Sequence, residues 1–126
     1  MMAIKRRDLD DLSQTIFDLL TDLGSIFTTA SEKADLTFIE FFYKRIDKES
    51  IMQHVIAKIL PFKQQIDNRN LFFFKENRYV FFSGLPEDRV SYYIDQILLL
   101  GSSDLQMIWE YLDTMIALAE SYKKCI

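Results

Sequence analysis

The feature that most constrains the fold of this chain is an apolar seam in residues 9–30. Apolar or small side chains recur there at alternating steps of three and four residues, at Leu9, Leu12, Ile16, Leu19, Leu23, Ile26 and Ala30. This spacing places them on one face of an α-helix, as in a coiled coil or a helical bundle. We therefore expect a long helix over residues 8–30, with its first turn at Asp8. Four aspartates are expected on its solvated face, Asp8, Asp11, Asp18 and Asp22.

A second seam of the same kind lies near the other end of the sequence. The same steps relate Leu105, Ile108, Leu112, Met115, Ala119 and Tyr122, which predicts a helix over residues 103–124. Ser103 and Gln106 have the spacing of a capping box at its start. Lys123 and Lys124 lie at its carboxyl end, where the helix dipole favours cations.

Shorter helices are expected between the two seams. The apolar positions predict helices over residues 35–46, 47–60 and 86–100, of which the first two could also form one bent helix. Asp35 and Asp47 are suitable N-caps, and Pro86 suits the first turn of a helix. The apolar runs 71–74 and 79–82 flank a polar link, which favours a β-hairpin near 71–82. A short helix with an extended connector fits almost as well, because short apolar runs cannot be assigned by periodicity.

Together these segments predict a mainly α fold. We expect one domain over residues 1–126, built as a compact bundle of five to six helices, with one short β-hairpin allowed near 71–82. The 126 residues include 3 glycines and 2 prolines, which is few for a many-stranded sandwich or barrel.

Charge and composition argue against several kinds of partner. The net charge of −4 disfavours nucleic acid as the main partner, because phosphate neutralisation supplies much of the affinity of such proteins. Residues 5–7 are basic, and a solvated lead-in is favoured there over contact with nucleic acid or anionic lipid. No apolar run is long enough to span a bilayer. With Cys125 as the single cysteine, no intrachain disulfide can form, and a cytoplasmic location is expected.

The residues that enzymes need are sparse in this sequence. The glycines at 24, 84 and 101 are too far apart to form a phosphate-binding loop, and no cysteine–histidine cluster could hold zinc. His54 is the single histidine, and pairing it with Cys125 would place the nucleophile near a helix end, where it is poorly held. We therefore expect no enzymatic activity, no metal and no cofactor.

The aromatic residues are the best candidates for a binding surface. Trp109 and Ile116 lie on a flank of the 103–124 helix, off its seam, while Tyr92, Phe41 and Phe72 belong to aromatic runs that a single face cannot hold. Tryptophan, tyrosine and phenylalanine are enriched in protein interfaces, so all five are candidate interface residues. The alternative is a thick core that buries these side chains.

Residues 104–119 also carry a pattern that resembles a known group of proteins. Their sequence, DLQMIWEYLDTMIALA, is similar to the IW-x-YL-x-x-L helix of small proteins from large nucleocytoplasmic DNA viruses, with Met115 in place of the usual leucine. The segment 66–74, IDNRNLFFF, resembles the polar turn and phenylalanine that precede that helix. The resemblance covers about the second half of the chain. It implies a helical viral protein, associated with the capsid or virion and made in the host cytoplasm, and it carries over no catalytic residues.

The sequence thus favours a structural or assembly protein. Such a protein, for example a minor capsid component, would bridge neighbouring protein subunits and form an oligomer or larger assembly. The alternative is a helical regulatory module with a groove that captures a partner helix. The first should self-associate or expose apolar patches when isolated, whereas the second should be a stable monomer.

Overall fold

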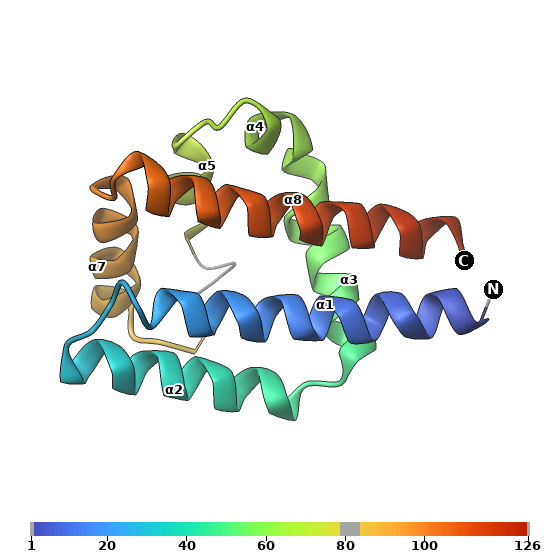
Figure 1. The fold of residues 1–126 in the computed structure, drawn as a ribbon, viewed down its shortest axis with the longest axis horizontal. Helices are drawn as coiled ribbons and strands as arrows, with labels where there is room; N and C mark the ends of the chain where they lie inside the picture. Colours follow the sequence, from blue (N-terminus) through green and yellow to red (C-terminus); the bar gives the residue numbers. More distant parts are fainter. Residues whose placement is uncertain (1, 79–83, 126) are drawn as a thin grey trace.

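Two long antiparallel helices form the centre of the molecule, α1 (Met2–Leu23) and α8 (Ser102–Lys124). They run side by side along its longest axis, so that the start of α1 and the end of α8 lie together at one end (Figure 1). The computed structural model describes residues 2–78 and 84–125. The α8 seam is buried from Ile108 onward, and the α1 seam is buried from Leu12 to Leu23. The predicted end of the first helix at residue 30 is wrong, because α1 ends at Leu23 and Ala30 is an exposed residue at the start of α2.

The remaining helices surround this pair. α2 lies beside α1, α3 crosses both central helices, and α7 stands across their other end (Figure 1). Their bounds are α2 (Ala30–Arg45), α3 (Lys48–Lys58), α4 (Lys63–Asp67), α5 (Phe72–Glu76) and α7 (Glu87–Leu98), with a 3-10 turn at Leu60–Phe62. The fold is compact and all-α, as the sequence predicts, and no described residue lies in a strand.

One core joins all these elements. Its most deeply buried residues come from helices throughout the chain and include Leu12, Ile39, Met52, Ile66, Phe73, Val90, Leu112 and Ala119. The predicted hairpin is wrong in its first half, because Phe72–Glu76 forms α5 instead of a strand. That segment buries two adjacent rings, Phe73 and Phe74, on one side of a helical turn, whereas adjacent residues of a strand point to opposite faces. Residues 79–82, the expected second strand, lie outside the described residues.

The helix starts differ from the expected ones at three places. α1 begins at Met2, so Asp8 lies inside the helix rather than in its first turn. α2 begins five residues before Asp35, because Thr29 forms a capping box with Glu32. α8 begins at Ser102 after an N-cap at Gly101 that has no side-chain bond, so the predicted Ser103 box is wrong. The Asp47 cap of α3 is confirmed, since its carboxylate accepts from the Ser50 N–H at 2.9 Å.

None of the described helices is long and apolar enough to cross a membrane.

Candidate functional site

Two of the five candidate interface residues are part of the core. Trp109 is 2% exposed and Ile116 is similarly buried, so the expectation that their flank of α8 faces a partner is not met. The flank is covered by α4, which packs on α8, and by α5. The ring centroids of Phe74 and Phe73 lie 4.8 and 6.5 Å from that of Trp109. The thick-core alternative therefore describes these two residues.

Arg69 and Asp113 form an ion pair beside the Trp109 ring. The Arg69 guanidinium lies 5.7 Å from the indole centroid. It also donates two hydrogen bonds to Asp113, at 2.9 and 2.8 Å, which raise the pKa of Arg69. Arg69 has a φ of 53°, a left-handed conformation that costs a non-glycine residue about 1–3 kcal/mol. The bidentate pair and the cation–π contact offset that cost, so the turn before α5 is fixed on α8.

Tyr92 is half-buried and belongs to a polar network between α2 and α7. Its hydroxyl donates to Glu32 at 2.6 Å, and this bond lowers the pKa of Glu32 and raises that of Tyr92. The Tyr93 hydroxyl donates to Asp35 at 2.6 Å, and Arg89 pairs with the same carboxylate at 2.8 Å. Each of the two carboxylates already accepts from a neighbour. The network is therefore suited to holding α2 on α7 rather than to acid–base chemistry.

Similar hydroxyl–carboxylate bonds join other helices. Tyr111 of α8 donates to Asp22 of α1, and burial together with this bond raises the pKa of Tyr111 to about 12. Tyr122 of α8 donates to Glu49 of α3 at 3.1 Å. The expected solvated face is wrong for two of its members, since Asp8 is buried and Asp22 is half-buried. Helical spacing does not show which hydroxyl approaches a carboxylate, so these bonds cannot be predicted from the sequence.

Phe41 and Phe72 are exposed, at 59% and 62%, on two different helices. Phe41 has an exposed neighbour, Phe38 at 48%, one turn earlier on the outer face of α2. The Arg45 guanidinium lies 5.4 Å from the Phe41 ring centroid. Phe38 lies against Gly84, where an added Cβ would come within 3.2 Å of the ring. We call the outer surface of α2 the α2 face; it is formed by Ala34, Thr37, Phe38, Phe41, Phe42 and Arg45.

The α2 face contains a depression beside its aromatic rings. Its six residues line a shallow depression of about 450 Å³. α2 is an outer helix that buries three residues, Glu32, Leu36 and Ile39, on the side toward the core. The side away from the core therefore combines projecting rings with a hollow, which is an arrangement suited to receiving apolar side chains of another protein.

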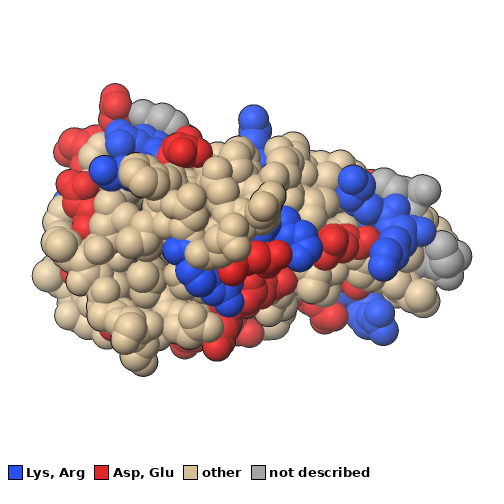
Figure 2. All heavy atoms as spheres, turned by 90° about the horizontal axis from the view of Figure 1, so that it is seen from above, with Lys and Arg blue, Asp and Glu red and all other residues tan. Residues whose placement is uncertain are grey.

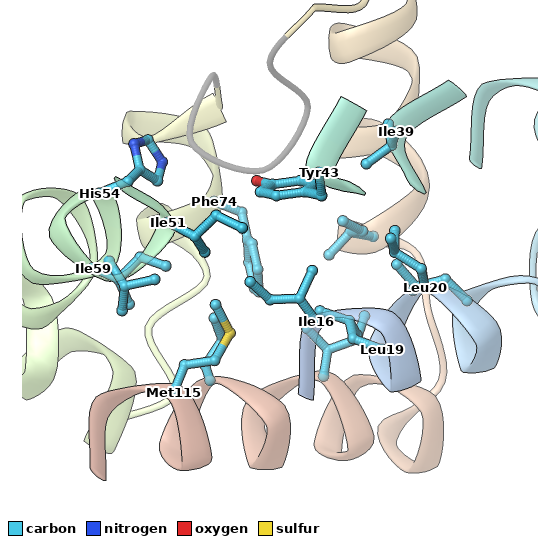
Figure 3. Close-up of a pocket in the computed structure, with 15 residues that line it drawn as sticks. Ile16, Leu19, Leu20, Ile39, Tyr43, Ile51, His54, Ile59, Phe74 and Met115 are labelled. Carbon is cyan, nitrogen blue, oxygen red and sulfur yellow. The ribbon is translucent and has the colours of Figure 1, made fainter. Parts of the chain in front are cut away.

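A second cavity lies within the core (Figure 3). It has a volume of about 60 Å³ and its walls are almost wholly apolar. Tyr43 and His54 lie on one side of it, and Met115 and Leu19 on the other (Figure 3). Burial raises the pKa of Tyr43. Apolar cavities of about 150 Å³ hold benzene, so this smaller space is better described as a packing defect than as a ligand site.

Filling this cavity should stabilise the protein. Val55 is fully buried and lines the cavity, so Val55→Ile adds one methylene where space exists. We expect the free energy of unfolding to rise by about 0.5–1 kcal/mol, measured by urea denaturation. Val90→Ile is the control, because Val90 is equally buried but does not line the cavity, and overpacking there should cost about 1–3 kcal/mol. Stabilisation by Val90→Ile but not by Val55→Ile would contradict the assignment.

No group of three or more potential metal ligands occurs among residues 2–78 and 84–125. Comparison with known proteins gives no further guidance, since no family model, curated protein or solved structure matches the chain.

Proposed function

We propose that this chain is a non-enzymatic assembly protein, and that the α2 face binds a second copy of the chain. The observation that supports this best is the pair of exposed rings, Phe38 and Phe41, beside a hollow on the same helix. Isolated exposed apolar residues are ordinary, but adjoining aromatic rings with a nearby arginine are typical of interface centres.

A second copy fits because the α2 face can complement itself. In a two-fold dimer the same patch lies on both sides of the interface, so each patch must supply both a projection and a recess. The α2 face has both, in Phe41 and in the hollow bordered by Ala34 and Thr37. Arg45 can stack on rings of the partner, as arginine often does in interfaces.

The contact should be weak between isolated copies. Four partly exposed rings, two from each copy, would contribute roughly 4–8 kcal/mol on burial. Association costs at least about 4 kcal/mol in lost freedom of motion. The difference is at most about 4 kcal/mol, which corresponds to a dissociation constant of about 1 mM or weaker. Such a contact suits a component that is already held near its neighbours, where a high local concentration favours binding.

Self-association can be measured by sedimentation velocity from about 0.1 to 2 mM, a range that spans the expected dissociation constant. The wild-type chain should shift towards a dimer as its concentration rises, and Phe41→Glu should remain monomeric. Leu99→Glu is the matched control, since Leu99 is exposed but lies outside the α2 face. Loss of association in Phe72→Glu instead would move the interface to α5. A wild-type monomer at every concentration would contradict the proposal and favour a regulatory module that binds a partner helix.

A finer proposal is that the chain is a minor capsid or virion-associated component, made in the host cytoplasm. It rests on the resemblance of residues 66–74 and 104–119 to viral proteins. These two segments contact each other through Arg69, Trp109 and Asp113, so they would act as one structural unit. Mass spectrometry of purified virus particles tests this proposal directly, and absence of the chain from them would overturn it.

A further inference from the structure

The fold brings together two basic segments that lie more than 100 residues apart in the sequence. The first turns of α1 and the last turn of α8 project side by side from one end of the molecule (Figure 1). Together they carry Lys5, Arg6, Arg7, Lys123 and Lys124, which we call the basic end. The space-filling view shows basic side chains gathered there (Figure 2).

Three contacts fix this end of the helix pair. The Ser121 hydroxyl donates to the buried Asp8 carboxylate at 2.7 Å. The Lys5 ammonium lies 5.2 Å from the ring centroid of Tyr122, whose hydroxyl donates to Glu49 of α3. The basic end is therefore built on a packed pair of helices, rather than on a solvated lead-in as the sequence suggested for residues 5–7.

The cations of the basic end form no ion pair with any described carboxylate. Residues 2–7 and 121–125 contain no aspartate or glutamate. Among the described carboxylates, none lies at ion-pair distance from the five cations, whereas Lys48 is paired with Asp10 at 2.7 Å. The formal net charge is −4, so removing these five cations leaves −9 for the rest of the chain. A third of the 15 basic residues therefore lie at this end, and the nearest acids in the sequence, Asp8, Asp10, Asp11 and Glu120, lie within the next turn of each helix.

Apolar side chains are exposed at the same end. Met2 is 75% exposed, and Ile4 is also exposed. Two signals strengthen the binding of a helix to a membrane surface, the apolar area that it buries and its electrostatic attraction to anionic lipids. Clusters of four to eight cations on a helical surface are typical of binding to anionic phospholipid. The basic end supplies both signals.

We propose that the basic end docks on an anionic phospholipid surface. The five cations contact the headgroups, while Met2 and Ile4 insert at the boundary of the acyl chains. Nucleic acid is a poorer fit, because single strands are bound by exposed aromatic rings, and Tyr122, the described aromatic residue of this end, is buried. Docking in this way stands the central helix pair upright on the membrane and leaves the α2 face, which runs alongside α1, open to the side (Figure 1).

The proposal is tested by co-sedimentation of the full chain with vesicles. Vesicles of phosphatidylcholine with about one third phosphatidylserine should bind it, and pure phosphatidylcholine should not. Arg7→Glu with Lys124→Glu should weaken binding at least about tenfold, as loss of two cation contacts implies. Lys33→Glu with Lys75→Glu is the control, because it makes the same charge change at exposed sites on α2 and α5. Circular dichroism confirms that each variant is folded.

A second variant separates lipid from other polyanions. Met2→Ser with Ile4→Ser leaves every charge in place and should weaken vesicle binding several-fold, with no effect on binding to a single-stranded oligonucleotide. Failure of the wild-type chain to bind anionic vesicles at low salt would overturn the proposal. Equal losses in the Arg7/Lys124 variant and the Lys33/Lys75 control would also overturn it, as would oligonucleotide binding without vesicle binding.

Discussion

Leu112→Asp is expected to unfold the domain. Leu112 is fully buried at the centre of α8, and it faces the cavity shared with α1 and α3. An aspartate there would place a carboxylate among apolar side chains that offer it no partner, at a cost of about 4–5 kcal/mol or more. This is most of the stability of an ordinary domain, which is roughly 5–15 kcal/mol. Far-ultraviolet circular dichroism and thermal melting measure the effect.

Thr114→Asp provides the control for that substitution. Thr114 lies two residues further along the same helix and is exposed, so the same new carboxylate is hydrated there. We expect its melting temperature to stay close to the wild-type value. A helical Leu112→Asp variant that melts like Thr114→Asp would show that the predicted seam is not the core.

Trp109→Ala should give the second large effect. The indole is buried beneath Phe73 and Phe74, and Arg69 covers its outer side. Removing it leaves a large cavity and deprives Arg69 of its cation–π partner, so the free energy of unfolding should fall by about 3–5 kcal/mol. Chemical denaturation of Trp109→Ala and the wild type measures the loss.

Phe72→Ala is the matching control, since Phe72 is an exposed aromatic residue of α5, next in sequence to Phe73. It should change the free energy of unfolding by less than about 0.5 kcal/mol. If Trp109→Ala were as stable as Phe72→Ala, Trp109 would not be a core residue, and its prediction as an interface residue would stand.

Leu112 and Trp109 show how far core residues can be distinguished from surface residues by sequence alone. The seams of α1 and α8 are long enough for their spacing to define a buried face, which is confirmed for α8 and for the part of the first seam up to Leu23. Trp109 lies off its seam, and its burial depends on α5, a helix of five residues. No periodic pattern can identify so short a helix, so the cover over Trp109 could not be predicted.

The basic end shows a second limit of sequence reasoning. The sequence accounts for each basic segment separately. It predicts that residues 5–7 are a solvated lead-in and that Lys123 and Lys124 interact with the helix dipole at the carboxyl end of their helix. Their proximity follows from the antiparallel packing of α1 on α8, which the spacing of the seams does not specify.

The start of α2 could in contrast be predicted from the sequence. Thr29 and Glu32 have the spacing of a capping box, but Asp35 also fits as an N-cap and would place the start five residues later.

The two proposed surfaces would support each other. Docking of the basic end would confine copies of the chain to one membrane surface. Confinement raises their local concentration, which would allow a weak contact between α2 faces to form. The proposed α2 contact does not depend on the membrane, because it would form between two copies of the chain wherever their concentration is high enough.

Disulfide cross-linking tests that contact most directly. In a Cys125→Ser background, a cysteine placed at Thr37 would lie within the hollow of the α2 face. If Phe41 of each copy enters the partner's hollow at Thr37, the two-fold axis passes between these positions, which brings the two copies of Thr37 close together. We predict rapid covalent dimerisation under mild oxidation, abolished by Phe41→Glu and absent for a cysteine at Lys75 of α5. Cross-linking that is equally fast at both positions, or unaffected by Phe41→Glu, would contradict assembly through the α2 face.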